Sequence, residues 1–193
     1  RFRGMFQRAV RAPNVNELFG PIATSLDNAT FDPCSNKDRV DADGNLLPNP
    51  RPISAELRAL CISTGMTNAQ VGAVPDIEAG QINIFVGTDP NNRPIPETAE
   101  TLTLGAVFQP DFFGDAILSP FISVDYYRIQ VDDPVDPYQP DDVLKACYEQ
   151  AQANFCSLIQ RVNGNLLTAG SGIQTFTTNL ASLKAEGVEI GAA

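Results

Sequence analysis

The stretch Arg8-Ala-Val-Arg-Ala-Pro-Asn-Val-Asn-Glu-Leu-Phe19 decides the fold class of this 193-residue chain. It closes a strand-like run that begins at Arg1, and it passes directly into a turn at Pro13-Asn14. Because successive side chains of a strand point to opposite faces, alternating residue types predict a strand with two unlike faces. One face of this run, interrupted by Arg8, holds Phe2, Gly4, Phe6 and Val10, whereas the other holds Arg1, Arg3, Gln7 and Arg11. The chain thus starts inside a strand, which indicates a piece of a larger protein.

The composition indicates β-structure joined by long loops. Charged residues make up 19% and apolar residues 43% of the chain, and both shares lie below the usual values. Much of the remainder is Asn, Gln, Ser, Thr, Gly and Pro, which favour turns and loops. The net charge of −10 argues against nucleic acid as a partner, because such binding relies on clustered Lys and Arg. No apolar run approaches the ~18 residues of a membrane-spanning helix, whereas barrel strands of ~10 residues would leave only a weak alternating signal.

An antiparallel hairpin is predicted in the middle of the chain. Residues 101–109 alternate, and their apolar side holds Leu102, Leu104, Ala106 and Phe108. A turn over residues 110–115 leads into a second alternating strand, Leu118–Val131, in which Pro120 lies where a missing backbone donor is tolerable. A last strand pair is predicted across Asn163-Gly164 and from Gly172 to the end.

Two long segments between these strands are predicted to be loops. Residues 20–95 are rich in Asn, Asp, Pro and Gly, with short helices over Ser54–Ser63 and Asn68–Gly72 and a brief strand over Gln81–Val86. In residues 134–172, Pro140-Asp141-Asp142 is a good start for a helix.

The four cysteines fall into two local pairs, Cys34 with Cys61 and Cys147 with Cys156. Neither pair has CxxC spacing and the chain has no His, so a zinc site is not expected. Two disulfides in an oxidising compartment are favoured over free buried thiols. On one straight helix Cys147 and Cys156 would be ~13 Å apart, whereas a disulfide needs Cα atoms within roughly 7 Å. If that bond exists, the helix must therefore break near Ala153-Asn154 and continue as a second short helix.

Four motifs follow one another and touch most of the chain outside residues 21–90: Arg8–Phe19, Pro96–Gly105, Val124–Ile129, and a paired-cysteine segment running from Cys147 to Gly187. The first resembles a strand and turn found late in the barrel of TonB-dependent outer-membrane receptors. The second and third are similar to two consecutive strands of that family. The fourth resembles the paired-cysteine loop and next strand of one large subgroup.

The resemblance implies a mainly β fold: part of a transmembrane antiparallel β-barrel of about 22 strands, plugged by an N-terminal domain. This chain would supply four to five strands with long, disulfide-stapled, partly helical extracellular loops. Its expected parts are a strand and rim (residues 1–20), a long loop (21–95), a hairpin (96–133), a helical loop (134–172) and a return strand (173–193). The plug is absent from this chain.

The implied function is the binding and import of a scarce solute, such as a siderophore, cobalamin or an oligosaccharide, across the outer membrane of a Gram-negative bacterium. The implied partners are that small-molecule or oligosaccharide ligand, outer-membrane lipid, and the TonB complex through the missing N-terminal region. The isolated piece would be transport-incompetent. It is expected either to form oligomers through its open sheet edges or to refold with its loop helices over the apolar face. Two alternatives remain: a secreted soluble β-sheet domain for binding or adhesion, and a hydrolase that relies on carboxylates.

Catalytic and metal chemistry have no support in the sequence. Asp41-Ala-Asp43-Gly44 resembles half a calcium loop, but Pro50 stands where the bidentate Glu should be, which favours a turn. Gly170-Ser171-Gly172 lacks the pattern of a nucleophile elbow, and without His there is no base for a triad. We therefore expect no enzyme activity, no cofactor and no metal.

Six residues are candidates for ligand contacts: Arg11, Asn14, Glu17, Arg93, Tyr127 and Tyr138. In a barrel the first three would lie at the outward end of the first strand. Aromatic residues near a barrel rim more often belong to the interfacial girdle. Arg93 and Arg161, both in loops, are expected to be solvated rather than ligand-bound.

Overall fold

The computed structural model describes residues 1–41, 43–77, 81–109 and 121–192. The chain divides into two compact units. The strand unit comprises Arg1–Leu18, Pro94–Asp136 and Asn179–Ala193, and the loop unit comprises Phe19–Arg93 and Pro137–Thr178. The fold is mainly β, with antiparallel pairing dominant, as predicted.

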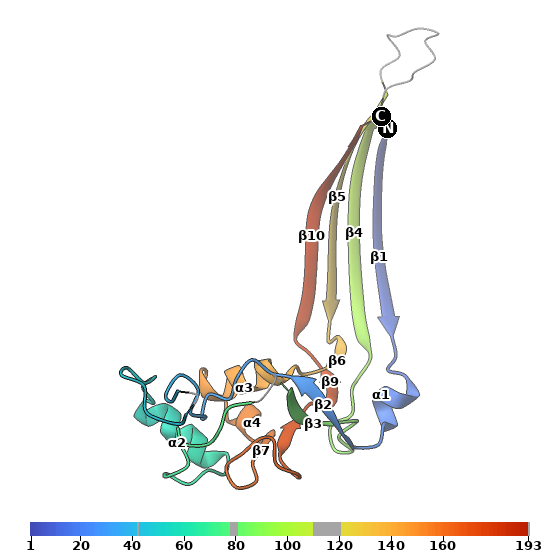
Figure 1. The fold of residues 1–193 in the computed structure, drawn as a ribbon. Helices are drawn as coiled ribbons and strands as arrows, with labels where there is room; N and C mark the ends of the chain where they lie inside the picture. Colours follow the sequence, from blue (N-terminus) through green and yellow to red (C-terminus); the bar gives the residue numbers. More distant parts are fainter. Residues whose placement is uncertain (42, 78–80, 110–120, 193) are drawn as a thin grey trace. The chain divides into compact units, whose positions relative to one another are not determined.

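The strand unit is built on a four-stranded antiparallel sheet with the order β1-β4-β5-β10 (Figure 1). Its strands are β1 (Phe2–Arg11), β4 (Glu97–Phe108), β5 (Ile122–Asp132) and β10 (Ser182–Ala192). The predicted hairpin is therefore confirmed as the pair β4 and β5, and its first strand begins four residues earlier than expected. The turn predicted over 110–115 and Pro120 lie outside the described residues. Within the described residues the sheet does not close, so β1 and β10 have one unpaired edge each.

The register places every even-numbered side chain of the four strands on one face and every odd-numbered one on the other, because even residues pair with even residues throughout. The even face has an apolar band at the end of the sheet near Phe108 and Ile122. The band consists of Phe2, Phe6, Leu102, Leu104, Ala106, Phe108, Ile122, Val124, Tyr126, Val188 and Ile190. Arg128 and Glu186 share the row of Phe6 and Leu102. The next row along the same face aligns the polar residues Arg8, Glu100, Gln130 and Lys184.

The odd face is polar alongside that band. Arg3 on β1 reaches across β4 and donates two hydrogen bonds to Asp125 on β5, at 2.9 and 2.6 Å. Gly105 makes this possible, since a Cβ there would lie 2.0 Å from the Asp125 carboxylate. In the same way, the Tyr127 ring lies over Gly187, where a Cβ would be 2.8 Å from the phenol oxygen. The two glycines thus leave room for larger polar side chains on this face.

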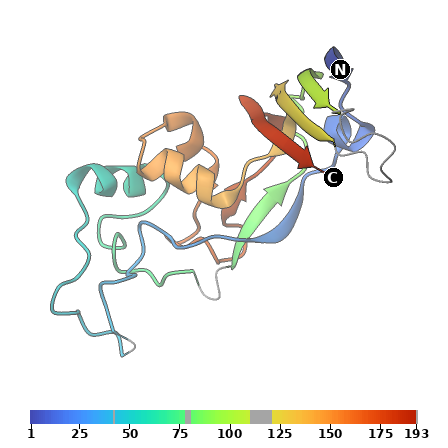
Figure 2. The ribbon, with the colours of Figure 1, turned by 90° about the horizontal axis from the view of Figure 1, so that it is seen from above.

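The described residues of the loop unit form a second sheet and three helices. The sheet has the order β2-β3-β8-β7, with β3 and β8 parallel, and comprises β2 (Ala23–Asn28), β3 (Gln81–Val86), β7 (Ile159–Gln160) and β8 (Gly172–Gln174). The helices are α2 (Ala55–Ser63), α3 (Pro140–Tyr148) and α4 (Ala153–Cys156), which are seen from above in Figure 2. A buried core joins sheet and helices, and includes Cys34, Cys61, Ile82, Val143, Cys147, Leu166 and Ile173.

Three further elements lie where the chain passes between the two units. They are the short helix α1 (Val15–Phe19) and the strands β6 (Val135–Pro137) and β9 (Thr177–Asn179). None of the helices in the described ranges is long and apolar enough to cross a membrane.

Both predicted disulfides form, so the free-thiol alternative is wrong. Cys34 bonds to Cys61 and Cys147 to Cys156, with Cα–Cα distances of 5.9 and 4.7 Å. As expected, the helix after Pro140 breaks and a second short helix follows. The break lies at residues 149–152 rather than near 153–154, because Ala151 takes a left-handed conformation with φ 53°.

The segment predicted as the first long loop is more structured than expected. The helix at Ser54–Ser63 and the strand at Gln81–Val86 are confirmed, whereas the strand β2 carried no clear alternation. The helix predicted over Asn68–Gly72 is wrong. Those residues form turns instead, because Gly72 has φ +77° and its N–H bonds to the Cys34 carbonyl at 2.8 Å. Asn163 and Gly164 form the predicted tight turn, with a bridge between Val162 and Asn165. The single strand predicted from Gly172 to the end is wrong, because that segment is divided into β8, β9 (Thr177–Asn179) and β10.

Candidate functional site

Three of the predicted ligand-contact residues come together at the end of β1. Asn14 lies in the turn after β1 and caps α1. Its side-chain oxygen accepts hydrogen bonds from the N–H groups of Asn16 and Glu17 at 2.9 and 3.0 Å. The Glu17 carboxylate in turn accepts the Asn14 N–H at 2.6 Å. This reciprocal pattern is a capping box, which fixes where the helix starts.

Arg11 ties that turn to the neighbouring strand. Its guanidinium donates to both carboxylate oxygens of Glu97, at 2.6 and 3.0 Å, and to both oxygens of Glu17, at 3.1 Å. Glu97 also accepts the Val135 N–H at 3.1 Å. The hydrogen bonds from Arg11 hold the pKa of Glu97 below its ordinary value. We call Arg11, Asn14, Glu17 and Glu97 the rim cluster. The hydrogen bonds among these four residues fix the conformation of the turn. Their role in ligand contact stays a prediction.

The aromatic and cationic candidates lie apart from the rim cluster. Arg93, in the loop unit, packs over the ring of Phe19 with 4.7 Å between the guanidinium carbon and the ring centroid. Tyr127 lies on the odd face of the sheet and lines a hollow of about 380 Å³ together with Arg3, Asp125 and Glu189. The Tyr127 phenol is thus placed beside charged side chains, and its role in an aromatic girdle or in ligand contact stays a prediction.

Tyr138 lines a second, smaller cavity of about 190 Å³ in the loop unit. Its ring meets the edge of Phe155, with 5.1 Å between ring centroids and 66° between ring planes. Edge-to-face contacts of this kind are favourable and hold both rings in one orientation. Tyr138 is therefore a rigid wall of the cavity.

Arg161 is not solvated, and that expectation is wrong. Its side chain is 0% exposed and that of Asp32 is 3% exposed. The guanidinium donates to both carboxylate oxygens of Asp32, at 2.6 and 2.7 Å, and to the Tyr148 hydroxyl at 2.9 Å. Burial raises the pKa of Tyr148, so the phenol that accepts this bond stays neutral. No local motif could have predicted a pair whose members stand 129 residues apart.

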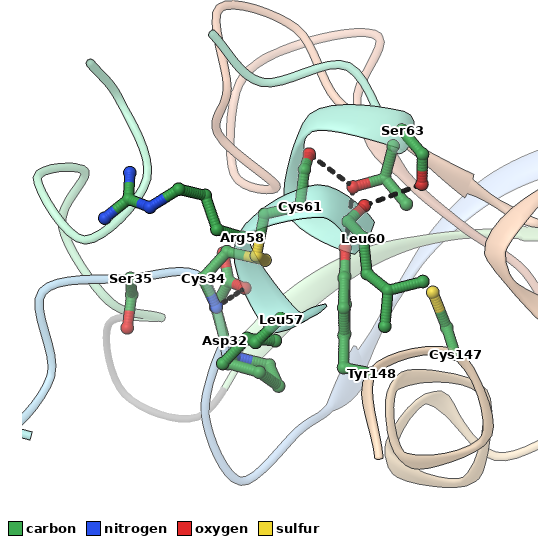
Figure 3. The surroundings of a disulfide bond; sticks show 12 residues. Asp32, Cys34, Ser35, Leu57, Arg58, Leu60, Cys61, Ser63, Cys147 and Tyr148 are labelled. Atoms are coloured by element: carbon green, nitrogen blue, oxygen red, sulfur yellow. Dashed lines mark hydrogen bonds between the residues drawn. A yellow bond between two sulfur atoms is a disulfide. The ribbon is translucent and has the colours of Figure 1, made fainter. Parts of the chain in front are cut away.

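The buried pair is joined to the first disulfide. Asp32 accepts the N–H of Cys34 at 2.9 Å, and the Tyr148 hydroxyl lies 2.8 Å from that of Thr64, just after α2. Figure 3 shows Asp32 beside Cys34 and Tyr148 beside Leu60, with Cys147 of the second disulfide nearby. Both disulfides and the ion pair thus converge on one region of the loop-unit core.

The side chains of Asp41 and Ser171, from the two motifs compared with a calcium loop and a nucleophile elbow, form hydrogen bonds within turns. Asp41 accepts the N–H groups of Asp43 and Asn45 at 3.0 and 2.8 Å, and these bonds lower its pKa. The Ser171 hydroxyl is buried and donates to the Thr168 carbonyl. Both arrangements are those of structural turns. Among the described residues, no group of three or more potential metal-ligating side chains lies together.

Comparisons with protein-family models, with curated proteins and with solved structures found no match to the chain.

Proposed function

We propose that this chain forms part of the barrel of an outer-membrane receptor of the TonB-dependent type, which binds and imports a scarce solute. The observation that carries the proposal is the apolar band on the even face of the strand unit. Large apolar side chains of the band point away from the unit's own atoms: Phe2 is 94% exposed and Ile190 is 74% exposed. A contiguous apolar surface of this kind needs a partner, and lipid is one that fits a flat sheet face.

The height of the band supports a lipid partner. On β1 and β4 it extends from the row of Phe108 and Ile122 to the row of Phe6 and Leu102, a distance of six residues along β4. On β5 and β10 that last row holds Arg128 and Glu186. At about 3.4 Å per residue this is roughly 20 Å, close to the apolar band of ~25 Å on outer-membrane barrels. Arg128 and Glu186 then lie at the edge of the lipid. The row with Arg8, Glu100, Gln130 and Lys184 lies beyond it, where charges are tolerated.

The other features of the strand unit fit the same proposal. The odd face, with Arg3, Asp125 and Tyr127, has the polar character of a barrel interior. The free edges of β1 and β10 would pair with further strands, since a barrel leaves no backbone group unpaired in lipid. Two disulfides suit a loop unit that is exposed to an oxidising exterior.

One observation favours the alternative of a secreted binding or adhesion domain. The loop unit has a buried core and two disulfides of its own, which is typical of secreted modules. That alternative requires a protein surface, not lipid, to cover the apolar band.

Spin labels on single introduced cysteines distinguish the two functions, because all four native cysteines are paired. The full-length protein in native outer membranes carries the label at Leu104→Cys or Val124→Cys on the even face, or at Thr103→Cys or Ser123→Cys on the odd face. We expect the even-face labels to be relaxed mainly by oxygen, which concentrates in lipid, and the odd-face labels by a water-soluble nickel chelate.

Gln130→Cys is the matched control, because it shares the even face but lies in the polar row. In a barrel it is reached by the nickel chelate, unlike Leu104→Cys. Labels at Leu104 and Val124 that neither reagent reaches would indicate a covering protein surface and would refute the membrane proposal.

A further inference from the structure

The small cavity in the loop unit is a feature that the proposed barrel does not use. It has a volume of about 190 Å³, and its walls include Asp89, Asn92, Tyr138, Asn154, Gln174 and Phe176. Pockets for drug-sized ligands measure about 300–1,000 Å³. A cavity of this size holds a single small ring, so a larger ligand would place only one of its units here.

The polar groups of this cavity are free to bind a ligand. In the described part of the chain, no hydrogen bond engages the side-chain amides of Asn92, Asn154 and Gln174. Each amide has both donor and acceptor atoms. Asp89 adds a carboxylate, one oxygen of which accepts the Asn91 N–H at 2.8 Å. The lining can therefore meet a ligand whose groups both donate and accept, as hydroxyls do.

The aromatic walls of the cavity add a second kind of contact. Tyr138 is held by the ring of Phe155, and Phe176 is half-buried. The quadrupole of an aromatic ring makes its face electron-rich. That face attracts the weakly positive C–H groups on the flat side of a pyranose. A rigid aromatic wall also loses little conformational entropy on binding.

The charges of the residues that line the cavity argue against anionic ligands. Asp89 is the one charged residue among the described residues that line it, and no Lys or Arg contributes. Recognition of carboxylates, phosphates or anionic iron chelates relies on such cations. A neutral ligand rich in hydroxyls is the class that matches amides, aromatic rings and a single carboxylate.

We propose that this cavity binds one neutral sugar ring of an oligosaccharide, with Asn92, Asn154 and Gln174 on its hydroxyls and Tyr138 and Phe176 against its C–H face. The inference rests on the proposed function for its role in uptake, because it names the class of solute that the receptor captures. Binding itself is measured without reference to the membrane.

Isothermal titration of the full-length protein in detergent tests the proposal with maltohexaose, cellohexaose and xylohexaose as neutral probes, and hexagalacturonate, ferrichrome and cyanocobalamin as competitors of other chemistry. We expect at least one neutral hexasaccharide to bind. The double variant Asn92→Ala/Asn154→Ala should bind it about 10- to 100-fold more weakly, from roughly 3- to 10-fold for each lost hydrogen bond.

Asn91→Ala is the matched control, because this exposed amide neighbours Asn92 but does not line the cavity. It should bind like the unaltered protein, and thermal unfolding should be unchanged in all variants. The proposal is overturned if none of the neutral hexasaccharides binds, if the double variant binds them as well as Asn91→Ala does, or if only a competitor binds. The spin-label accessibilities do not depend on a ligand. They therefore test the membrane proposal independently, even if no neutral hexasaccharide binds.

Discussion

The two units of this chain use their apolar residues in opposite ways. In the strand unit, the apolar side chains of Phe2, Phe6, Val188 and Ile190 on the even face are at least 60% exposed. In the loop unit, the apolar side chains of Ile82, Val143, Leu166 and Ile173 are almost completely buried. The loop unit is therefore stabilised by its own buried core. The sheet of the strand unit pairs its own backbone, but it depends on its surroundings to cover its apolar face.

The largest expected effect is a loss of stability in the loop unit when Arg161 is replaced. Arg161→Met leaves the Asp32 carboxylate buried without its cation, which costs about 3–5 kcal/mol of unfolding free energy. The partners of Arg161, namely Asp32 and Tyr148, belong to the loop unit. Amide hydrogen exchange with increasing urea should therefore show weaker protection in the loop unit and unchanged protection in β4 and β5.

The double variant Arg161→Met/Asp32→Asn separates charge from packing. It removes the unpaired carboxylate while keeping an acceptor for the Cys34 N–H, so it should regain part of the lost stability. A double variant as unstable as Arg161→Met would mean that the guanidinium acts through its packing and its bond to Tyr148 instead.

Removal of the disulfides is the next largest effect. Cys34→Ser/Cys61→Ser opens a link with a sequence separation of 27 residues, and the chain-entropy relation gives a loss of about 3–4 kcal/mol. The Cys147–Cys156 link spans 9 residues and should contribute about 2–3 kcal/mol by the same relation. Urea unfolding of the two double variants checks the order; an equal loss would indicate that residual unfolded structure, not loop length, decides it.

A charge introduced into the apolar band tests how much the strand unit depends on lipid. Under the membrane proposal, Val124→Arg places a cation against lipid and should weaken folding into bilayers by about 2–4 kcal/mol. Ser123→Arg, one residue earlier on the odd face, is the matched control and should be tolerated. Reversible folding of the full-length protein into vesicles measures both. Equal effects from the two substitutions would contradict an even face in lipid.

Local patterns in the sequence predicted the strand unit well because a strand's faces depend only on the alternation of neighbouring residues. The runs around Phe6, Leu104 and Val124 carry that alternation, and each lies in a strand of the sheet. The loop unit was predicted only where a local rule applied, as with the short helix over Ser54–Ser63, the strand at Gln81–Val86 and the paired cysteines. The strand β2 has no clear alternation because five of its six residues are exposed.

The candidate site shows the same limit. Arg11 and Glu17 were both predicted as contact residues near one turn, but the contact of Arg11 with Glu97 follows only from the strand register. The cavity with Tyr138 draws its walls from residues 89 to 178, and the Arg161 pair spans an even longer separation. Such long-range pairings depend on tertiary packing, which periodicity in one sequence does not encode.

The smallest predicted effect tests a single local rule inside the loop unit. The Ser54 hydroxyl accepts the Leu57 N–H at 3.1 Å and caps α2, so Ser54→Ala should lower the unfolding free energy by about 1 kcal/mol. Ser63→Ala, at the other end of the same helix, removes a hydroxyl that donates only to the Leu60 carbonyl and should matter less. Urea unfolding compares them. Because α2 carries Cys61, a loss from Ser54→Ala that persists in Cys34→Ser/Cys61→Ser would show that the cap stabilises the helix itself. A loss that disappears there would instead show that the cap acts by positioning the cysteine for its disulfide.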